Sequence, residues 1–208
     1  EELNSKISKA ELREKIEKGQ CLISNDARQK RYNQKGVTLW ITGMHGSGKN
    51  ELAYKLEKEL FDLGANVVLL DGSTLRSGLS KELDFSPADR TEHLRRVAHI
   101  ARILNDQGII TICSFISPNE NIRRQVAQII GIERFHSIFM DASIAFCKKN
   151  RPDLYQLAEV SKIDNLPGVH IIFENPLKPD IVINPELEMI SPERVINYLN
   201  KNKIFPME

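Results

Sequence analysis

The chain has 208 residues, a formal net charge of +1 and 41% apolar residues, which suits one globular α/β domain with an appended segment. The small net charge provides no basic field that would favour nucleic acid as a partner, and no apolar run reaches the roughly 20 residues of a membrane span. The widely spaced Cys21, Cys113 and Cys147 exclude a disulfide framework or zinc pattern and favour reduced thiols in the cytoplasm.

Residues 1–35 are rich in charged side chains and poor in aromatic ones, so they are predicted to be an N-terminal helical segment and linker. The run from Ser8 to Glu11 fits a capping box, and the helix that it begins is expected to continue to about Lys18, where Gly19 ends it. Asn25–Gly36 is interpreted as the linker.

From residue 36 to residue 208, short β-branched runs alternate with amphipathic segments. This alternation predicts a parallel sheet of about five strands with helices on both faces. Residues 150–176 interrupt the pattern with a polar, proline-containing stretch that is expected to be a lid. The expected strands are Val37–Thr42, Asn66–Asp71, Ile109–Phe115, Phe135–Asp141 and Ile181–Asn184. The expected helices are Lys49–Leu63, Pro87–Gln107, Pro118 to near Gly131, and one after Ser191-Pro192.

The segment between the first strand and the next helix matches the phosphate-loop pattern G-x-x-x-x-G-K. Its glycines allow several backbone N–H groups to turn toward one point, and the following helix adds its positive N-terminal end. Lys49 is expected to reach the β- and γ-phosphates of ATP or ADP. The sequence therefore predicts a P-loop NTPase-type α/β fold, with nucleotide contacts from Gly43, His45, Gly46, Ser47, Gly48, Lys49 and Asn50.

One position departs from this pattern, because the Ser or Thr that ligates Mg²⁺ after the lysine is replaced by Asn50. Asparagine offers a carbonyl oxygen on a longer side chain, whereas Mg²⁺ requires short, nearly octahedral oxygen contacts. Metal binding is therefore expected to be weakened, shifted or mediated by water. Glu51 adds a negative charge that would oppose phosphate binding if it pointed inward.

A series of further motifs from Gly36 onward resembles the adenylylsulfate kinase (APS kinase) family. These motifs are Gly36–Gly43, Leu69–Gly72, Arg76 with Gly78-Leu79, Phe85-Ser86 with Asp89-Arg90, Arg95-Arg96, Phe115–Pro118 and Glu174–Pro176. The resemblance implies transfer of the γ-phosphate of MgATP to the 3′-hydroxyl of adenosine 5′-phosphosulfate (APS), which gives PAPS. It also implies a homodimer. The short stretch Ile7–Arg13 resembles the tail of an ATP sulfurylase domain, which implies a fused sulfurylase as a partner.

The resemblance also implies roles for individual residues. Arg76, Phe85 and Arg90 would hold APS, since guanidinium groups suit its phosphosulfate and an aromatic ring suits its adenine. Ile116 and His93 would touch the same substrate. The residues implied at the reacting groups are Lys49, Asp71, Ser73 and Ser117. The residues implied as metal ligands are Asp71 and Asn50. Taken singly, Phe85 would more often be a core residue, the two arginines solvated ion-pair partners, and His93 a half-exposed helix residue. Ser117 could equally be an N-cap before Pro118.

Two departures from the family bear on its chemistry. Ser73 replaces the second aspartate of the family's Asp-Gly-Asp motif, and serine is not a general base near neutral pH without its own activator. The lid has Gln156–Glu159 where the family has a basic stretch, so cations that would neutralise developing charge are missing there.

Three interpretations follow from these patterns. The first is a degenerate APS kinase domain that binds ATP, ADP, APS or PAPS as a regulatory or structural module. The second is a working APS kinase that uses Asn50 and Asp71 for its metal. The third is a kinase for another small alcohol.

Overall fold

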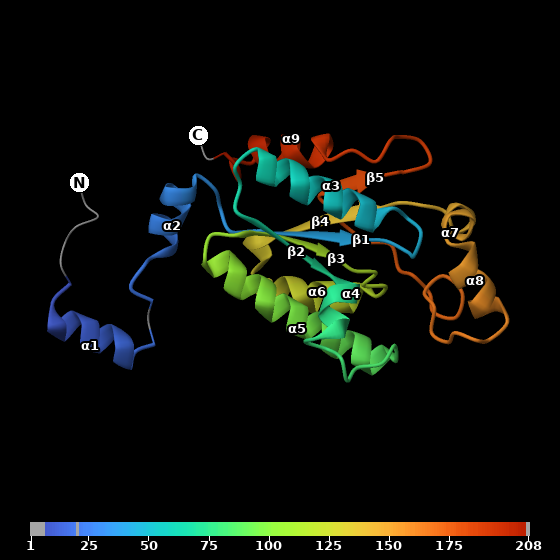
Figure 1. The fold of residues 1–208 in the computed structure, drawn as a ribbon, viewed down its shortest axis with the longest axis horizontal. Coiled ribbons are helices and arrows are strands. Elements are labelled where there is room, and N and C mark those ends of the chain that lie inside the picture. The colour runs from blue at the N-terminus through green and yellow to red at the C-terminus, as the bar shows by residue number, and fades with distance from the viewer. Residues whose placement is uncertain (1–6, 20, 207–208) are drawn as a thin grey trace.

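The computed structural model describes residues 7–19 and 21–206, and its centre is a five-stranded parallel sheet of order β2-β3-β1-β4-β5 (Figure 1). The middle strand β1 pairs with β3 and β4 in parallel, with Thr38 opposite Thr111 and Phe135. Both faces of β1 are covered, which explains why its sequence is apolar or β-branched without alternation. The strands are β1 Thr38–Thr42, β2 Val67–Asp71, β3 Ile110–Ser114, β4 Phe135–Met140 and β5 Ile181–Ile183.

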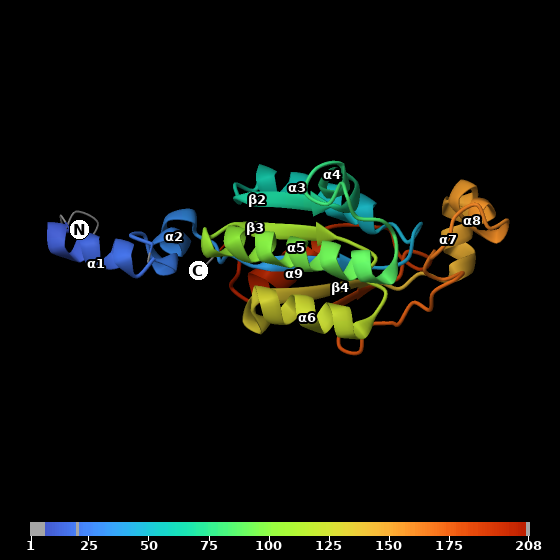
Figure 2. The same cartoon turned by 90° about the horizontal axis from the view of Figure 1, so that it is seen from below.

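Helices cover both faces of the sheet, as the sequence predicts (Figures 1 and 2). One core joins alternate strand residues such as Leu39 and Ile41 to α3 and α9. The other core places Trp40 and Cys113 against α5 and α6. None of the described helices is both long enough and apolar enough to span a bilayer. The helices are α1 Lys9–Glu17, α2 Asn25–Tyr32, α3 Lys49–Asp62, α4 Gly72–Ser77, α5 Pro87–Asp106, α6 Glu120–Ile130, η2 Ile132–Arg134, α7 Ile144–Asn150, α8 Pro152–Glu159 and α9 Glu193–Lys201.

The N-terminal helix α1 is as predicted, with both halves of the capping box formed between Ser8 and Glu11. The interpretation of Asn25–Gly36 as a linker was wrong, because most of this stretch is the helix α2. The Ser24 side chain accepts from the N–H of Ala27 at its start, and Asn33 closes it in the left-handed conformation with φ of 50°. The polar composition of this stretch favoured a linker, although Ser24 and Asn33 are residue types that commonly cap a helix.

Three further differences lie near the site. The helix expected from Pro118 begins at Glu120, because the Asn119 side chain accepts from the N–H groups of Asn121 and Ile122. The short helix α4 follows β2 directly and was not predicted, since Asp71 caps it with its own carboxylate. The lid contains the helix α8, whose Tyr155 and Ala158 pack into a small cluster with Cys147.

Candidate functional site

The loop Gly43–Lys49 connects the end of the central strand β1 to the start of α3, at the carboxyl edge of the sheet. At Gly46, φ is +83°, and an added Cβ atom would lie 2.5 Å from the carbonyl oxygen of Cys147. At Gly43, an added Cβ would lie 2.6 Å from the Ser47 hydroxyl. Only glycine fits these close approaches, and they hold the loop in its compact turn.

Residues at the start of the lid hold the outer side of this loop. The Asn150 side-chain amide donates to the carbonyl of Gly46 at 3.0 Å, and the Tyr155 hydroxyl donates to the carbonyl of His45 at 2.9 Å. Two loop carbonyls therefore contact the lid, and within the loop the Ser47 N–H donates to the Met44 carbonyl at 3.2 Å.

Lys49 and His45 both lie in a positive environment. Lys49 is 8% exposed and its Nζ atom donates to the Met44 carbonyl at 3.4 Å. Burial, with a smaller contribution from the charge of Arg151, lowers the pKa of Lys49 to about 8. Burial also lowers the pKa of His45 to about 3, again with repulsion from Lys49 and Arg151. An anion at this position would relieve these repulsions.

A cavity of about 410 Å³ lies next to the loop and falls within the size range of ligand pockets. It joins the loop to the ends of β2 and β3 and to the first turns of α5. Five of the predicted site residues lie outside its lining, namely Gly43, Gly46, Ser47, Gly48 and Asp71. The buried Ser47 hydroxyl has no hydrogen-bond partner among the described residues. The other predicted site residues all line it: His45, Lys49, Asn50, Ser73, Arg76, Phe85, Arg90, His93, Ile116 and Ser117.

At the far end of the cavity, an exposed aromatic ring is flanked by two guanidinium groups. Phe85 is 58% exposed, so the alternative interpretation as a core residue was wrong. The Arg76 guanidinium carbon lies 4.4 Å from its ring centre and that of Arg90 lies 5.9 Å away. Arg90 donates to the carbonyls of Phe85 and Asn165, which fixes it between this ring and the lid.

His93 differs from the half-exposed helix residue that was the alternative, because it is only 3% exposed. Its ring meets Phe115 edge-on at 5.5 Å, and neither ring nitrogen has a hydrogen-bond partner among the described residues. Burial lowers the pKa of His93 to about 4, with repulsion from Arg76. A neutral imidazole at the wall offers one donor and one acceptor to a ligand.

The Ser117 hydroxyl is engaged in the wall of the pocket. It accepts from the Trp40 indole N–H at 3.0 Å and donates to the Thr42 hydroxyl at 2.9 Å. Its backbone is strained, with φ of 38°. The alternative as an N-cap was wrong, since Asn119 caps the helix. Its catalytic role stays a prediction, and the geometry makes it a support for the loop after β3.

The donors expected for Mg²⁺ are already used within the protein. The Asp71 carboxylate accepts from the backbone N–H groups of Ser73 and Thr74 and from the Thr74 hydroxyl, so it caps α4. The Asn50 carbonyl oxygen accepts from the Ser114 hydroxyl at 2.8 Å. Among the described residues, no cluster of three His, Cys, Asp or Glu side chains is arranged for a metal. This donor set does not fit a directly ligated Mg²⁺.

Sequence reasoning missed two polar side chains of the pocket, those of Arg151 and Ser114. Arg151 follows α7 directly and supplies a cation at the start of the lid, whose downstream basic stretch is absent. The signal for Arg151 in the sequence was its position, because a cationic residue directly before Pro152 stands at the start of the lid. Glu51 forms an ion pair with Lys55 at 2.6 Å, so it does not oppose an anion in the pocket.

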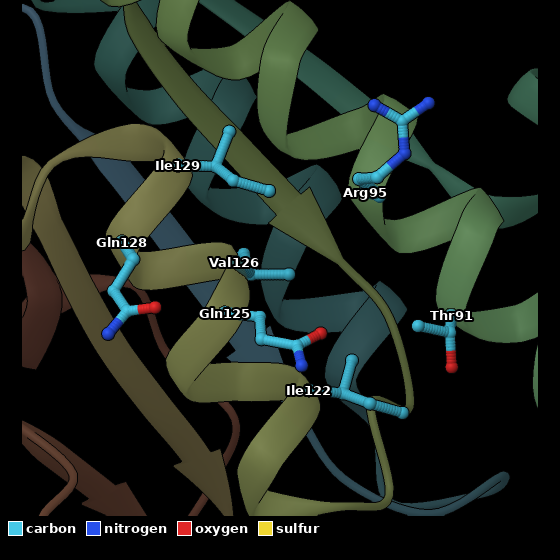
Figure 3. Close-up of a pocket in the computed structure, with 7 residues that line it drawn as sticks. All are labelled: Thr91, Arg95, Ile122, Gln125, Val126, Gln128 and Ile129. Atoms are coloured by element: carbon cyan, nitrogen blue, oxygen red, sulfur yellow. The ribbon is translucent and has the colours of Figure 1, made fainter.

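A second cavity, of about 320 Å³, is a groove between α5 and α6 (Figure 3). Thr91 and Arg95 line it from α5, and Ile122, Val126 and Ile129 are among its residues from α6. Arg95 forms an ion pair with Glu92 at 2.7 Å. None of the residues predicted for the site lines this groove, so the chemistry is assigned to the cavity beside the phosphate loop.

Comparisons with known proteins agree with this geometry. The family model described as adenylylsulphate kinase matches residues 35–184. An adenylyl-sulfate kinase of Pseudomonas aeruginosa is 38% identical over 193 residues, which are 90% of this chain and 97% of that protein. One from Oceanobacillus iheyensis is 40% identical over 83% of this chain and 88% of its own length.

A solved structure has the same fold and a related sequence. It is the Mycobacterium tuberculosis APS kinase CysC in complex with AMPPNP and APS, with a TM-score of 0.75 and 35% identity. The match covers 80% of this chain and 99% of that one. Family model, curated relatives and structure thus agree over most of the sequence, and the chain belongs to the adenylylsulphate kinase family.

Proposed function

We propose that this protein is an adenylyl-sulfate kinase, which transfers the γ-phosphoryl group of ATP to the 3′-hydroxyl of APS. The observation that supports this is that one cavity is lined by Lys49 of the phosphate loop at one end and by Phe85 with its two arginines at the other. The APS kinase of known structure is described in complex with a nucleotide analogue and APS together.

At the loop end, the residues provide several groups that bind anions. The N-terminal end of α3 directs backbone N–H groups and a partial positive charge at the phosphates. Lys49 adds a buried point charge, and Arg151 lines the same cavity from the lid. Such groups stabilise the charge that develops on the transferred phosphoryl group, which is the main contribution of the protein in phosphoryl transfer.

At the other end, Phe85 presents a ring face on which adenine would stack, and Arg76 and Arg90 would pair with the phosphosulfate. Arg90 is held by two carbonyls, so little side-chain freedom is lost when it binds an anion. This arrangement would direct the 3′-hydroxyl of the substrate toward the phosphate loop.

In the reaction, the 3′-oxygen forms a bond to the γ-phosphorus while the bond from that phosphorus to the β–γ bridging oxygen breaks. The hydroxyl proton passes to a phosphate oxygen of the transferred group or to solvent, because no carboxylate lines the cavity to receive it. The proposed contribution of the protein is therefore alignment and electrostatics, without a strong general base. We expect turnover to be slow for this reason.

The proposal is tested by incubating the protein with ATP and APS and measuring PAPS and ADP formation by chromatography. Matched reactions omit APS or use Lys49→Ala. Formation of PAPS that requires both substrates and Lys49 supports the kinase. ADP formation that is independent of APS would indicate a different acceptor.

A second candidate function is a binding module that holds ATP, ADP, APS or PAPS without transfer. Two observations favour it, namely the use of the Asp71 carboxylate as a helix cap and the presence of Ser73 beside it. Calorimetric binding of APS and ADP by a protein that makes no PAPS would establish this module instead of the enzyme.

A further inference from the structure

The side chain of Asn50 lies at the first turn of α3. Its carbonyl oxygen accepts the Ser114 hydroxyl proton at 2.8 Å, and both residues line the cavity beside the phosphate loop. An amide is planar, so holding its oxygen against the end of β3 leaves the NH₂ group on the opposite side. No acceptor for that NH₂ group occurs among the described residues, and it remains a donor at the N-terminal end of α3.

The charge of the cavity favours anions over metal cations. Four cationic side chains line it, Lys49, Arg76, Arg90 and Arg151, and none of its lining residues is Asp or Glu. The carboxylate predicted for the metal, that of Asp71, already accepts three hydrogen bonds at the start of α4. A divalent cation would thus meet repulsion from four cations with no carboxylate to offset it.

From this arrangement we infer that Asn50 is a phosphate-binding residue rather than a metal ligand, and that the protein binds adenine nucleotides without requiring Mg²⁺. The amide N–H takes the place at which a hydroxyl would otherwise ligate the metal, and Ser114 orients it. Lys49 and Arg151, at the loop end of the cavity, neutralise the polyphosphate charge that Mg²⁺ neutralises in a site with metal ligands. This inference rests on the proposed nucleotide site and concerns how that site binds its ligand.

The experiment is isothermal titration calorimetry of the full chain with ADP, once in excess Mg²⁺ and once in EDTA. The expected dissociation constants differ by less than about threefold between the two conditions, since no protein ligand to the metal contributes. A dissociation constant more than about tenfold lower with Mg²⁺ would overturn the inference and leave the kinase proposal standing. No heat of binding in either condition, with PAPS formation also absent, would overturn both.

Two variants at the same position sharpen the result. Asn50→Ser restores the hydroxyl of the common motif, and we expect Mg²⁺ to tighten its ADP binding about tenfold. Asn50→Ala removes the N–H donor, so we expect ADP binding to weaken about tenfold equally with Mg²⁺ and with EDTA. Circular dichroism melting curves check that both variants are folded. If Asn50→Ala leaves both dissociation constants unchanged, Asn50 does not bind phosphate and the inference is wrong.

Discussion

At the scale of single residues, the clearest functional consequence concerns Lys49. Its ammonium group is buried, and burial lowers its pKa to about 8. A phosphate binds the protonated form, so it raises this pKa, and binding takes up a proton above pH 8. We expect the dissociation constant for ADP to be flat below about pH 7.5 and to rise by up to about tenfold for each pH unit above the pKa.

Calorimetry between pH 7 and pH 9.5, in buffers of different ionisation heat, measures both the slope and the proton uptake. Lys49→Arg is the matched control, because a guanidinium keeps its charge to about pH 12 and should remove the slope. A wild-type dissociation constant that is constant to pH 9.5 would show that Lys49 is not the titrating contact.

Ser73 is the second residue with a sharp prediction. It lines the cavity where the family motif has an aspartate, and its backbone N–H is held by Asp71 at 2.8 Å, so a longer side chain would start from a fixed position. Ser73→Asp supplies a general base, and we expect kcat for PAPS formation to rise by about 10²-fold.

Ser73→Asn is the control, because asparagine has nearly the shape of aspartate but cannot act as a base. This variant should leave kcat near the wild-type value. An equal gain in both variants would assign the effect to packing rather than to proton transfer. No gain in Ser73→Asp would remove the argument that the missing base limits turnover.

The site residues show where sequence reasoning works and where it stops. The loop and its lysine were predictable because the motif, the strand before it and the helix after it specify one geometry. The bond between Asn50 and Ser114 was not predictable, because its partners are 64 positions apart. The cap formed by Asp71 is local, but the pattern did not show that its carboxylate would accept from the next helical turn. The contact of the buried His93 with Phe115 was likewise not predictable, because Phe115 follows β3, a separate element.

At the scale of elements, Gln34, the second residue after α2, joins the N-terminal segment to the sheet. Gln34 is fully buried; its amide nitrogen donates to the carbonyls of Asn66 and Gly108, and its oxygen accepts from the N–H of Asn66. A single side chain thus provides hydrogen-bond partners for backbone groups just before β2 and in the turn before β3. Nothing in the sequence predicts this contact, since a glutamine in a polar stretch usually faces solvent.

We expect Gln34→Ala to lower the free energy of unfolding by about 3 kcal/mol, since three hydrogen bonds are lost and their backbone partners stay buried. Urea denaturation followed by circular dichroism measures this change. Gln128→Ala, at an exposed position of α6, is the control and should shift the free energy by less than about 0.5 kcal/mol. Equal effects in the two variants would mean that the Gln34 bonds contribute no net stability.

At the scale of the whole molecule, α1 lies apart from the domain (Figures 1 and 2). None of its residues is buried, and Ile16 is 66% exposed. We expect deletion of residues 1–18 to change the free energy of unfolding by less than about 0.5 kcal/mol and to leave the ADP dissociation constant unchanged. A loss of several kcal/mol would reveal that α1 packs on the domain.

Sedimentation velocity on the same pair of proteins tests the predicted homodimer and its dependence on this helix. The resemblance of Ile7–Arg13 to a sulfurylase tail also stays a prediction, because nothing in the fold of α1 itself distinguishes that origin. The alternation of strands and helices, in contrast, was sufficient to predict the sheet and its two helical layers, since right-handed crossovers leave few arrangements.

The bond from Trp40 to Ser117 links the indole at the centre of the fold to a hydroxyl in the wall of the pocket. Trp40 is also the one tryptophan of the chain. Its emission therefore comes from a single, buried reporter whose hydrogen bond is sensitive to small movements of the loop after β3. A ligand that shifts that loop will change the intensity or the emission maximum of the tryptophan fluorescence. The occupancy of the pocket can therefore be followed in real time on the unlabelled protein.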